Sequence, residues 1–191
     1  MTLRIRRVVF ALLCALQLGA AARGVVRYER TLADGKVVLF PCAPLDPADP
    51  FRGRYVQLSF TLTPSSVKVL GEPITGYNEP GYAVLHTDGN GFAIIDYVSK
   101  TRPGEGQFVK VKLSTYGPDT TSITPLFDRY YMAEELAPAA EQAYLETAIR
   151  FRNTADAQRS YAIVRILDGV AVLEGVMLGG EPIEEVARRK R

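Results

Sequence analysis

An apolar run flanked by arginines near the start of the chain limits its fold more than any other feature. The run covers residues 8–22, follows three arginines, and is interrupted only by Gln17. Fifteen helical residues span about 22 Å, which is less than the roughly 30 Å hydrocarbon core of a bilayer. Arginine side chains at both ends can snorkel and lengthen the reach. We therefore expect residues 1–24 to form a single-pass transmembrane helix that anchors the chain.

The same segment also fits a cleavable signal peptide. Its start is basic, its centre is apolar, and the small residues at 19–22 satisfy an A-x-A cleavage site. A cleaved protein would begin near Arg23 and be periplasmic or secreted. A buried core helix is a third interpretation. For the anchor, basic residues on the two sides nearly balance. The usual outcome for a short basic start puts the domain on the extracytoplasmic side of the membrane, and we expect that orientation.

Beyond the anchor we expect one domain over residues 25–187 and a basic tail over 188–191. The chain is 47% hydrophobic and 23% charged, which is typical of a globular protein. Its net charge of +2 is too small to indicate nucleic-acid binding. Cys14 and Cys42 make no disulfide framework, and Cys14 lies inside the apolar run, so we expect no intramolecular disulfide.

Alternation of apolar and polar residues predicts strands through most of the domain. The clearest case is the segment 55–63, where residues 56, 58, 60 and 62 are all apolar and face one side. Asp-Gly or Gly-Gly pairs at 34–35, 168–169 and 179–180, and the turn at 88–91, predict tight connections between strands. The proline-rich segment 41–50 predicts an extended loop. The expected strands are 25–30, 36–40, 55–63, 82–86, 92–98, 108–115, 127–132, 161–167, 170–178 and 181–186.

One helix is expected, over residues 137–152. Pro138 is tolerated in its first turn, and apolar residues from Ala140 to Ile149 recur at helical spacing. Many strands and one helix predict an α+β fold that is mainly β. We expect a mostly antiparallel sheet or a partly closed barrel, with the helix packed against it.

The segment 45–60, LDPADPFRGRYVQLSF, carries a recognisable signature. Supporting segments are YERTLADG at 28–35, VLFP at 38–41, RYYM at 129–132, VRI at 164–166 and GEPI at 180–183. Together they resemble the GDYXXLXY protein family, in the expected order and over most of the chain after the anchor. The resemblance implies a membrane-anchored bacterial protein of unknown biochemical function, sometimes associated with multi-pass membrane partners.

Gly53, Tyr55 and Leu58 match the signature residue by residue. Arg54 stands where the pattern has Asp, which reverses a charge and puts any role of that acid in doubt. Phe60 stands where the pattern has its final Tyr and loses only a hydroxyl. A structural interpretation is that Gly53 turns the chain into a strand whose faces the other three fill. A binding surface on the preceding loop, 41–52, is the alternative.

Catalytic constellations are weak in this sequence. His86 is the only histidine, with Asp88 two residues later, but no Gly-x-Ser-x-Gly elbow accompanies them. Cys42 could act as a nucleophile only with a lysine such as Lys68 or Lys110 beside it. We expect none of these to be catalytic.

Metal and cofactor sites are equally weakly indicated. One histidine and two separated cysteines cannot supply a zinc site. Asp46 and Asp49 fall short of the six to eight oxygens that calcium requires. Glycine-rich stretches at 89–91 and 104–106 do not open helices, so phosphate cradling lacks its structural context. We expect no metal and no cofactor.

The sequence therefore predicts a membrane-anchored envelope protein that acts as a non-catalytic binding or assembly module. Its expected partners are the membrane and a multi-pass membrane protein, not nucleic acid. Two alternatives stay open, namely an envelope hydrolase that uses His86 or Cys42, and a secreted ligand-binding module.

Overall fold

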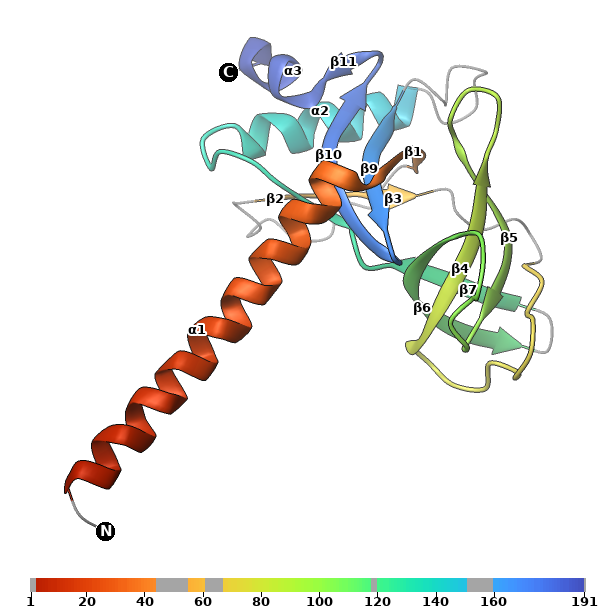
Figure 1. The fold of residues 1–191 in the computed structure, drawn as a ribbon. Helices are drawn as coiled ribbons and strands as arrows, with labels where there is room; N and C mark the ends of the chain where they lie inside the picture. Colours follow the sequence, from red (N-terminus) through yellow and green to blue (C-terminus); the bar gives the residue numbers. More distant parts are fainter. Residues whose placement is uncertain (1–2, 44–54, 61–66, 118–119, 151–159, 191) are drawn as a thin grey trace.

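The computed structural model describes residues 3–43, 55–60, 67–117, 120–150 and 160–190 of the 191-residue chain (Figure 1). A long helix leads into a β-rich body, and two shorter helices lie near its C-terminal end. The elements are α1 (Leu3–Asp34), β1 (Lys36–Ala43), β2 (Tyr55–Gln57), β3 (Ser59–Phe60), β4 (Glu79–Thr87), β5 (Ala93–Ser99), β6 (Gln107–Gly117), β7 (Thr120–Pro125), β8 (Arg129–Tyr131), α2 (Ala137–Arg150), β9 (Tyr161–Leu167), β10 (Val170–Leu178), β11 (Glu181–Pro182) and α3 (Ile183–Lys190).

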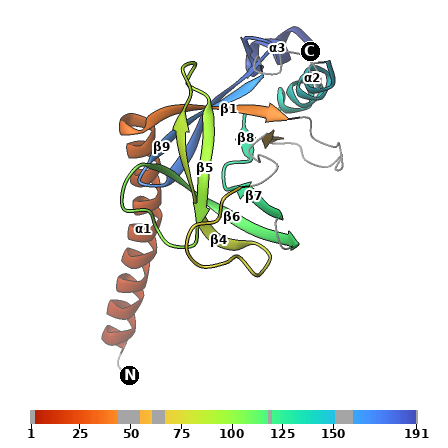
Figure 2. The ribbon, with the colours of Figure 1, turned by 90° about the vertical axis from the view of Figure 1, so that its right-hand side faces the viewer.

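The strands form three sheets whose paired strands all run antiparallel. A five-stranded sheet has the order β11-β10-β9-β1-β3, a four-stranded sheet the order β5-β4-β6-β7, and β2 pairs with β8. Figure 2 shows the four-stranded sheet beside the layer that contains β1 and β9, with α2 and α3 at the other end of that layer. This arrangement confirms the predicted mainly β, mostly antiparallel fold behind an N-terminal apolar helix.

One hydrophobic core joins these layers. Val38, Phe40 and Val164 from the five-stranded sheet belong to the same buried cluster as Leu113 from the four-stranded sheet. The helices α2 and α3 contribute Ala140, Tyr144, Ile183 and Ala187, each at most 1% exposed. The described part of the chain therefore packs as one β-rich body with two helices closing one end.

The helix α1 corrects the prediction of a strand at 25–30. The helix continues without interruption to Asp34, and Gly35 N–H donates to the Thr31 carbonyl at 2.9 Å to close its last turn. An Asp-Gly pair can end a helix as well as build a hairpin, because glycine readily adopts the conformations that follow a last helical turn. Arginine, glutamate, leucine and alanine among residues 27–33 favour the helix, and no strand of the described chain pairs with this segment.

The segment 55–63 was predicted with the correct faces but as a single strand. Val56 and Leu58 are 0% and 3% exposed, whereas Tyr55 and Gln57 are only partly buried. The backbone changes sheets in the middle, because β2 pairs with β8 and β3 pairs with β1. Leu58 N–H donates instead to the Asp128 carbonyl at 2.8 Å. Residues 61–63 lie outside the described part.

The start of the proline-rich segment is also strand, contrary to the prediction of a loop from residue 41. Pro41 lies opposite Tyr161 within β1, and Cys42 N–H donates to the Ser160 carbonyl at 2.9 Å. Successive N–H groups of a strand point to opposite sides. Because the Cys42 N–H points toward β9, the backbone nitrogen of Pro41 faces away from β9, where no hydrogen bond to β9 is lost. A proline is tolerated at such a position. Residues 44–54, which contain most of the predicted loop, lie outside the described part.

The predicted strand 181–186 is wrong beyond its first two residues. The structure has β11 at Glu181–Pro182 and then α3. Two glutamates in the first turn and three basic residues in the last turn favour this helix, because they complement its dipole. Residues 188–190 of the expected tail are thus helical, and Arg189 and Lys190 pair with Glu181 and Glu146.

Several predicted elements are confirmed closely. The strands β9 and β10 have the predicted bounds, and Asp168 and Gly169 between them both adopt positive φ, as a tight hairpin turn requires. In the 88–91 turn, Asp88 Oδ1 accepts the N–H groups of Asn90 and Phe92, each at 2.8 Å. The predicted helix is α2, which ends at residue 150. The strand β7 was not predicted.

Candidate functional site

A cleft of about 500 Å³ lies where the end of α1 meets the β-rich body. Tyr28 of α1, Lys112 of β6, residues 124–131 and residues 171–173 of β10 line it. These segments are far apart in the sequence and meet only because α1 packs against β9 and β10. The cleft therefore lies directly beside the helix that carries the apolar run.

An aromatic and cationic cluster forms one rim of the cleft. Tyr55 lies opposite Tyr131 in the β2–β8 pair, with ring centroids 5.7 Å apart. The Arg129 guanidinium lies 5.2 Å from the centroid of the Tyr55 ring, within cation–π range. Hydrogen bonding to Tyr131, and the charges of Tyr55 and Asp128, raise the pKa of Arg129 further. Tyr131 is 67% exposed, so this cluster offers an amphipathic face to a binding partner.

The strand β8 is fixed to the helical end of the fold by its middle residue. The Tyr130 hydroxyl donates to Glu184 Oε1 of α3. Burial, followed by the hydrogen bond and charge of Glu184, raises the pKa of Tyr130. Tyr130 lines the cleft together with its neighbours Arg129 and Tyr131, so this hydrogen bond also fixes that part of the cleft wall.

The signature residues divide between the core and this rim. Leu58 is buried, and the Phe60 ring packs 6.1 Å from Phe40 and 5.3 Å from Phe127 between centroids. The Ser59 N–H between them donates to the Tyr144 hydroxyl at 3.2 Å. Tyr55 instead packs against Tyr131 and Arg129, which line the cleft. Gly53 and Arg54 lie outside the described residues, so the expectation of a turn at Gly53 stays a prediction.

A sequence model of the GDYXXLXY protein family matches residues 17–176, which is most of the chain. The chain belongs to this family. A search of curated proteins and a search of solved structures each found no match. The family match confirms the resemblance drawn from the signature, and it extends from the apolar helix through β10. Within this GDYXXLXY protein, the signature thus links a buried strand segment to an exposed aromatic rim.

His86 does not meet a nucleophile in the described part of this GDYXXLXY protein. Its Nδ1 lies 2.7 Å from Asp96 Oδ1 on the neighbouring strand, and both side chains are substantially exposed. Asp88, the residue considered for a triad, instead caps the hairpin turn. The arrangement is a surface hydrogen bond across two strands.

Cys42 is equally unsuited to nucleophilic chemistry. Burial raises the pKa of its thiol to about 12, so the thiol is protonated near neutral pH. No hydrogen bond or ion pair joins it to Lys68 or Lys110 in the part of the chain that the structure describes. Cys14 and Cys42 are both free.

The described residues contain no cluster of three or more His, Cys, Asp or Glu side chains that could hold a metal ion. Asp46 and Asp49 lie outside those residues. The arrangement that remains is a cleft with aromatic, aliphatic and cationic lining, which suits binding. Sequence reasoning did not identify this site. One sequence pattern could have indicated it: Arg129 and Tyr131 occupy alternate positions of a predicted strand and so share one face. This strand lies in the segment 129–132, which also carries part of the family resemblance.

Proposed function

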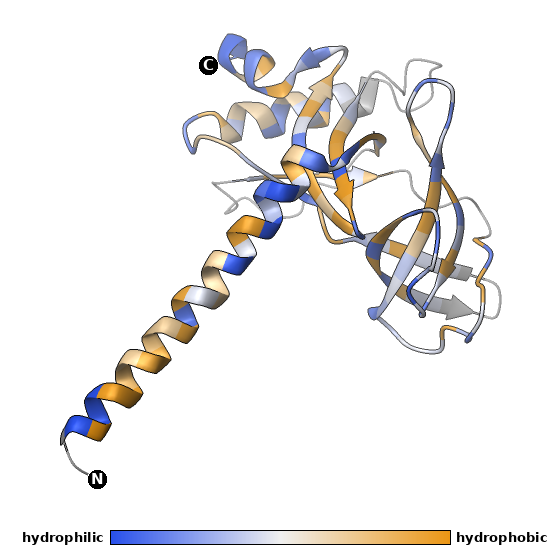
Figure 3. Cartoon of the chain, viewed as in Figure 1, coloured by the Kyte–Doolittle hydropathy of each residue, from blue (hydrophilic) through white to orange (hydrophobic). Residues whose placement is uncertain are grey.

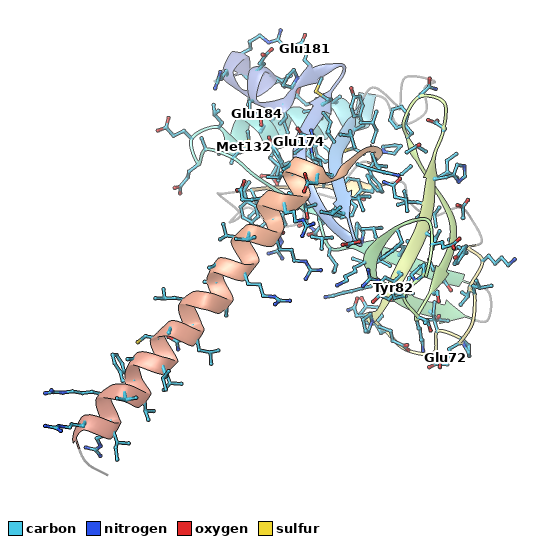
Figure 4. All side chains as sticks on the ribbon, in the orientation of Figure 1. Glu72, Tyr82, Met132, Glu174, Glu181 and Glu184 are labelled. Carbon is cyan, nitrogen blue, oxygen red and sulfur yellow. The ribbon has the colours of Figure 1, made fainter. Side chains whose placement is uncertain are left out.

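We propose that this GDYXXLXY protein is a membrane-anchored envelope protein whose β domain is a non-catalytic binding or assembly module. The observation that carries the proposal is the length, apolar character and exposure of α1. Its segment Arg4–Asp34 is the one helix in the described part of the chain that is long and apolar enough to cross a membrane, and none of its apolar window is buried. In Figure 3 the middle of α1 is predominantly orange, and in Figure 4 the N-terminal part of α1 extends away from the rest of the molecule.

The continuity of α1 supports a membrane span more strongly than the run 8–22 alone. Because the helix does not end before Asp34, the apolar stretch extends through Val26, with Arg23 as its single charged residue. Nineteen residues at 1.5 Å each give about 28 Å, close to the roughly 30 Å hydrocarbon core. Val25 and Val26 are 62% and 64% exposed, which is unfavourable in water and favourable at a membrane.

The position of the cleft supports a partner at the membrane surface. The cleft includes Tyr28, two residues beyond the apolar stretch, so an anchored chain would hold it close to the bilayer. Tyrosine is enriched at that level in membrane proteins. We propose that the cleft binds the extracytoplasmic face of a multi-pass membrane protein, with the Tyr55–Arg129–Tyr131 rim as its central contact.

Fractionation tests the anchor. The full-length chain should stay with membranes after carbonate extraction, and its intact mass should include residues 1–22. A soluble product that begins near Arg23 would contradict the anchor and favour the secreted alternative.

Affinity capture from solubilised membranes tests the cleft. Tyr131→Ala should reduce recovery of a multi-pass membrane protein at least fivefold, since truncation of a central aromatic contact commonly costs more than 1 kcal/mol. Tyr77→Ala is the matched control, because Tyr77 is 68% exposed but does not line the cleft. Equal recovery by both variants would contradict a binding role for the rim.

The hydrolase alternative has its own test. His86→Ala and Cys42→Ser should leave the phenotype of a complemented deletion strain near wild type, since neither residue contacts a nucleophile or catalytic base among the described residues. Loss of function in either variant, with its circular dichroism spectrum unchanged, would overturn the non-catalytic assignment.

A further inference from the structure

Basic side chains from three distant segments converge beside α1, next to the cleft. A cavity of about 230 Å³ is lined by Arg27 and Arg30 of α1, Arg102 of the β5–β6 loop and Lys110 of β6. Asp168 is the one carboxylate in its lining. The cavity therefore holds four cationic groups and one anionic group, and the surplus positive charge suits an anionic ligand.

The cations are not neutralised by the rest of the described chain. Arg102 lies 3.9 Å from Asp168, but both side chains are more than 60% exposed, and Arg30 lies 3.7 Å from Asp34 outside the cavity lining. Exposed pairs at such distances contribute little. Arg27 and Lys110 have no side-chain ion pair among the described residues. Arg27 of α1 and Lys110 of β6 thus line the same cavity, with no ion-pair partner in the described part of the chain.

The position of this cavity along α1 coincides with the expected headgroup layer, which is about 5–7 Å thick. If the hydrocarbon boundary lies at Arg23, then Arg27 lies about 6 Å above it. If the hydrocarbon core instead takes twenty residues from Val8, the boundary lies at Arg27 itself. Either placement puts Arg27 in the headgroup layer and Arg30 within a few ångströms of it.

A second cavity continues the first and is mainly apolar. It shares Arg27, Lys110 and Val170 with the basic cavity and adds Tyr28 and Leu126. Leu126 is 57% exposed, an unfavourable arrangement in water. A cationic recess that opens into an apolar one matches an amphipathic ligand with a phosphate, and it fits a nucleic acid or a phosphorylated peptide less well.

We propose that the junction of α1 with β6 and the β9–β10 turn binds the phosphate of an anionic phospholipid. Arg27 and Lys110 contact the phosphate, and Tyr28 and Leu126 contact the apolar part of the same lipid. The site fixes the height and tilt of the β domain on the membrane. This inference rests on the membrane anchor proposed above.

The test uses the full-length chain reconstituted into nanodiscs of phosphatidylcholine alone or of an equal mixture with phosphatidylglycerol. Native mass spectrometry of the released protein counts the lipids that it retains. Phosphatidylglycerol should be retained in preference to phosphatidylcholine. The double variant R27Q/K110Q should reduce that preference about thirtyfold, which corresponds to about 2 kcal/mol at 1.4 kcal/mol per factor of ten.

The control R188Q/R189Q removes the same charge from α3, whose helix lies at the far end of the β-rich body from the N-terminal part of α1 (Figure 1). It should retain phosphatidylglycerol like the parent, and all variants should melt like the parent. The proposal would be overturned if the parent retained the two lipids equally. It would also be overturned if both double variants lost the preference for phosphatidylglycerol to the same extent.

Three outcomes separate a site for soluble anions, a wrong anchor and a wrong lipid site. Displacement of the retained lipid by inorganic phosphate would show a site for soluble anions instead of lipids, which also overturns the proposal. Failure of the full-length chain to enter discs of either composition would contradict the anchor itself. Entry into both discs without lipid preference would contradict only the lipid site.

Discussion

Replacing Gly35 by alanine tests whether the end of α1 is fixed to the β domain. Gly35 closes the last turn of α1 through its N–H, and its carbonyl accepts a hydrogen bond from Arg165 Nη1 at 3.4 Å. Arg165 is itself held by both carboxylate oxygens of Glu174, at 2.8 and 3.2 Å. The helix α1 therefore passes into β1 through one residue that contacts the neighbouring strand β9.

The magnitude follows from the space around Gly35. A Cβ atom there would lie 2.3 Å from the Thr31 carbonyl oxygen, 3.1 Å from Arg165 Cβ and 3.2 Å from Ile166 N. Two of these atoms are backbone, so no rotamer change relieves the contact. Forced overpacking costs about 1–3 kcal/mol, and loss of the Gly35–Thr31 hydrogen bond costs about 1 kcal/mol more. We expect a total destabilisation of about 2–4 kcal/mol.

Thermal unfolding of the full-length chain in detergent measures this effect. At about 2–4 °C per kcal/mol for a chain of this size, Gly35→Ala should lower Tm by about 5–15 °C. Trypsin should also cut faster after Arg27 and Arg30. Gly24→Ala is the matched control, because Gly24 is an exposed helical residue with nothing within 4 Å of an added Cβ, and alanine stabilises such positions slightly. A Gly35→Ala variant that melts within about 1 °C of the parent would refute the fixed junction.

Three further predictions concern the β domain. Gly169 and Gly179 both have positive φ, which alanine adopts only with strain, but only a Cβ added at Gly169 would meet the Phe108 ring, at 2.6 Å. Thermal melts should therefore show that Gly169→Ala destabilises the protein by about 2–4 kcal/mol and Gly179→Ala by only about 1–2 kcal/mol. Because the pKa of Cys42 is raised in the folded protein, its thiol ionises at lower pH in the unfolded chain, and the free energy of unfolding should fall as pH rises from 9 towards 12. Melts of Cys42→Ala should lack this part of the pH dependence. Tyr144→Phe should cost about 1 kcal/mol by urea titration, since a backbone amide of β3 loses its acceptor.

The strands that could be predicted from the sequence are those whose local pattern and tertiary environment agree. In β9 the odd and even residues alternate between partly and fully buried along its whole length, and an Asp-Gly turn follows it directly. The strand β7 was missed because Ile123 is its only large apolar residue, so no alternation marks it. Its pairing with β6 comes from the neighbouring strand and leaves no local signal.

The error at 25–30 has a different physical origin. Val25, Val26 and Tyr28 have β-prone side chains, and Asp34-Gly35 resembles a hairpin turn. The same residues also suit a helix that continues from a membrane span, and only the preceding apolar run distinguishes the two. The cleft could not be predicted from the sequence, because its lining comes from distant segments. Tyr28 lies about a hundred residues before Arg129, and Arg129 and Val172 belong to different sheets, so only tertiary packing brings the three together.

The described part of the GDYXXLXY signature, from Tyr55 to Phe60, is a strand segment that changes sheets at Leu58. Val56 and Leu58 are fixed in the core, and β2 pairs with β8 in one register, so Tyr55 has to lie opposite Tyr131. The buried residues of this segment thereby position Tyr55, which is partly buried and packs against the exposed ring of Tyr131. Replacing Leu58 would disturb the cleft rim indirectly, by loosening β2, and loss of binding in such a variant would say nothing about direct contact. Tyr55 and Tyr131 are the residues at which a binding role and a packing role can be separated.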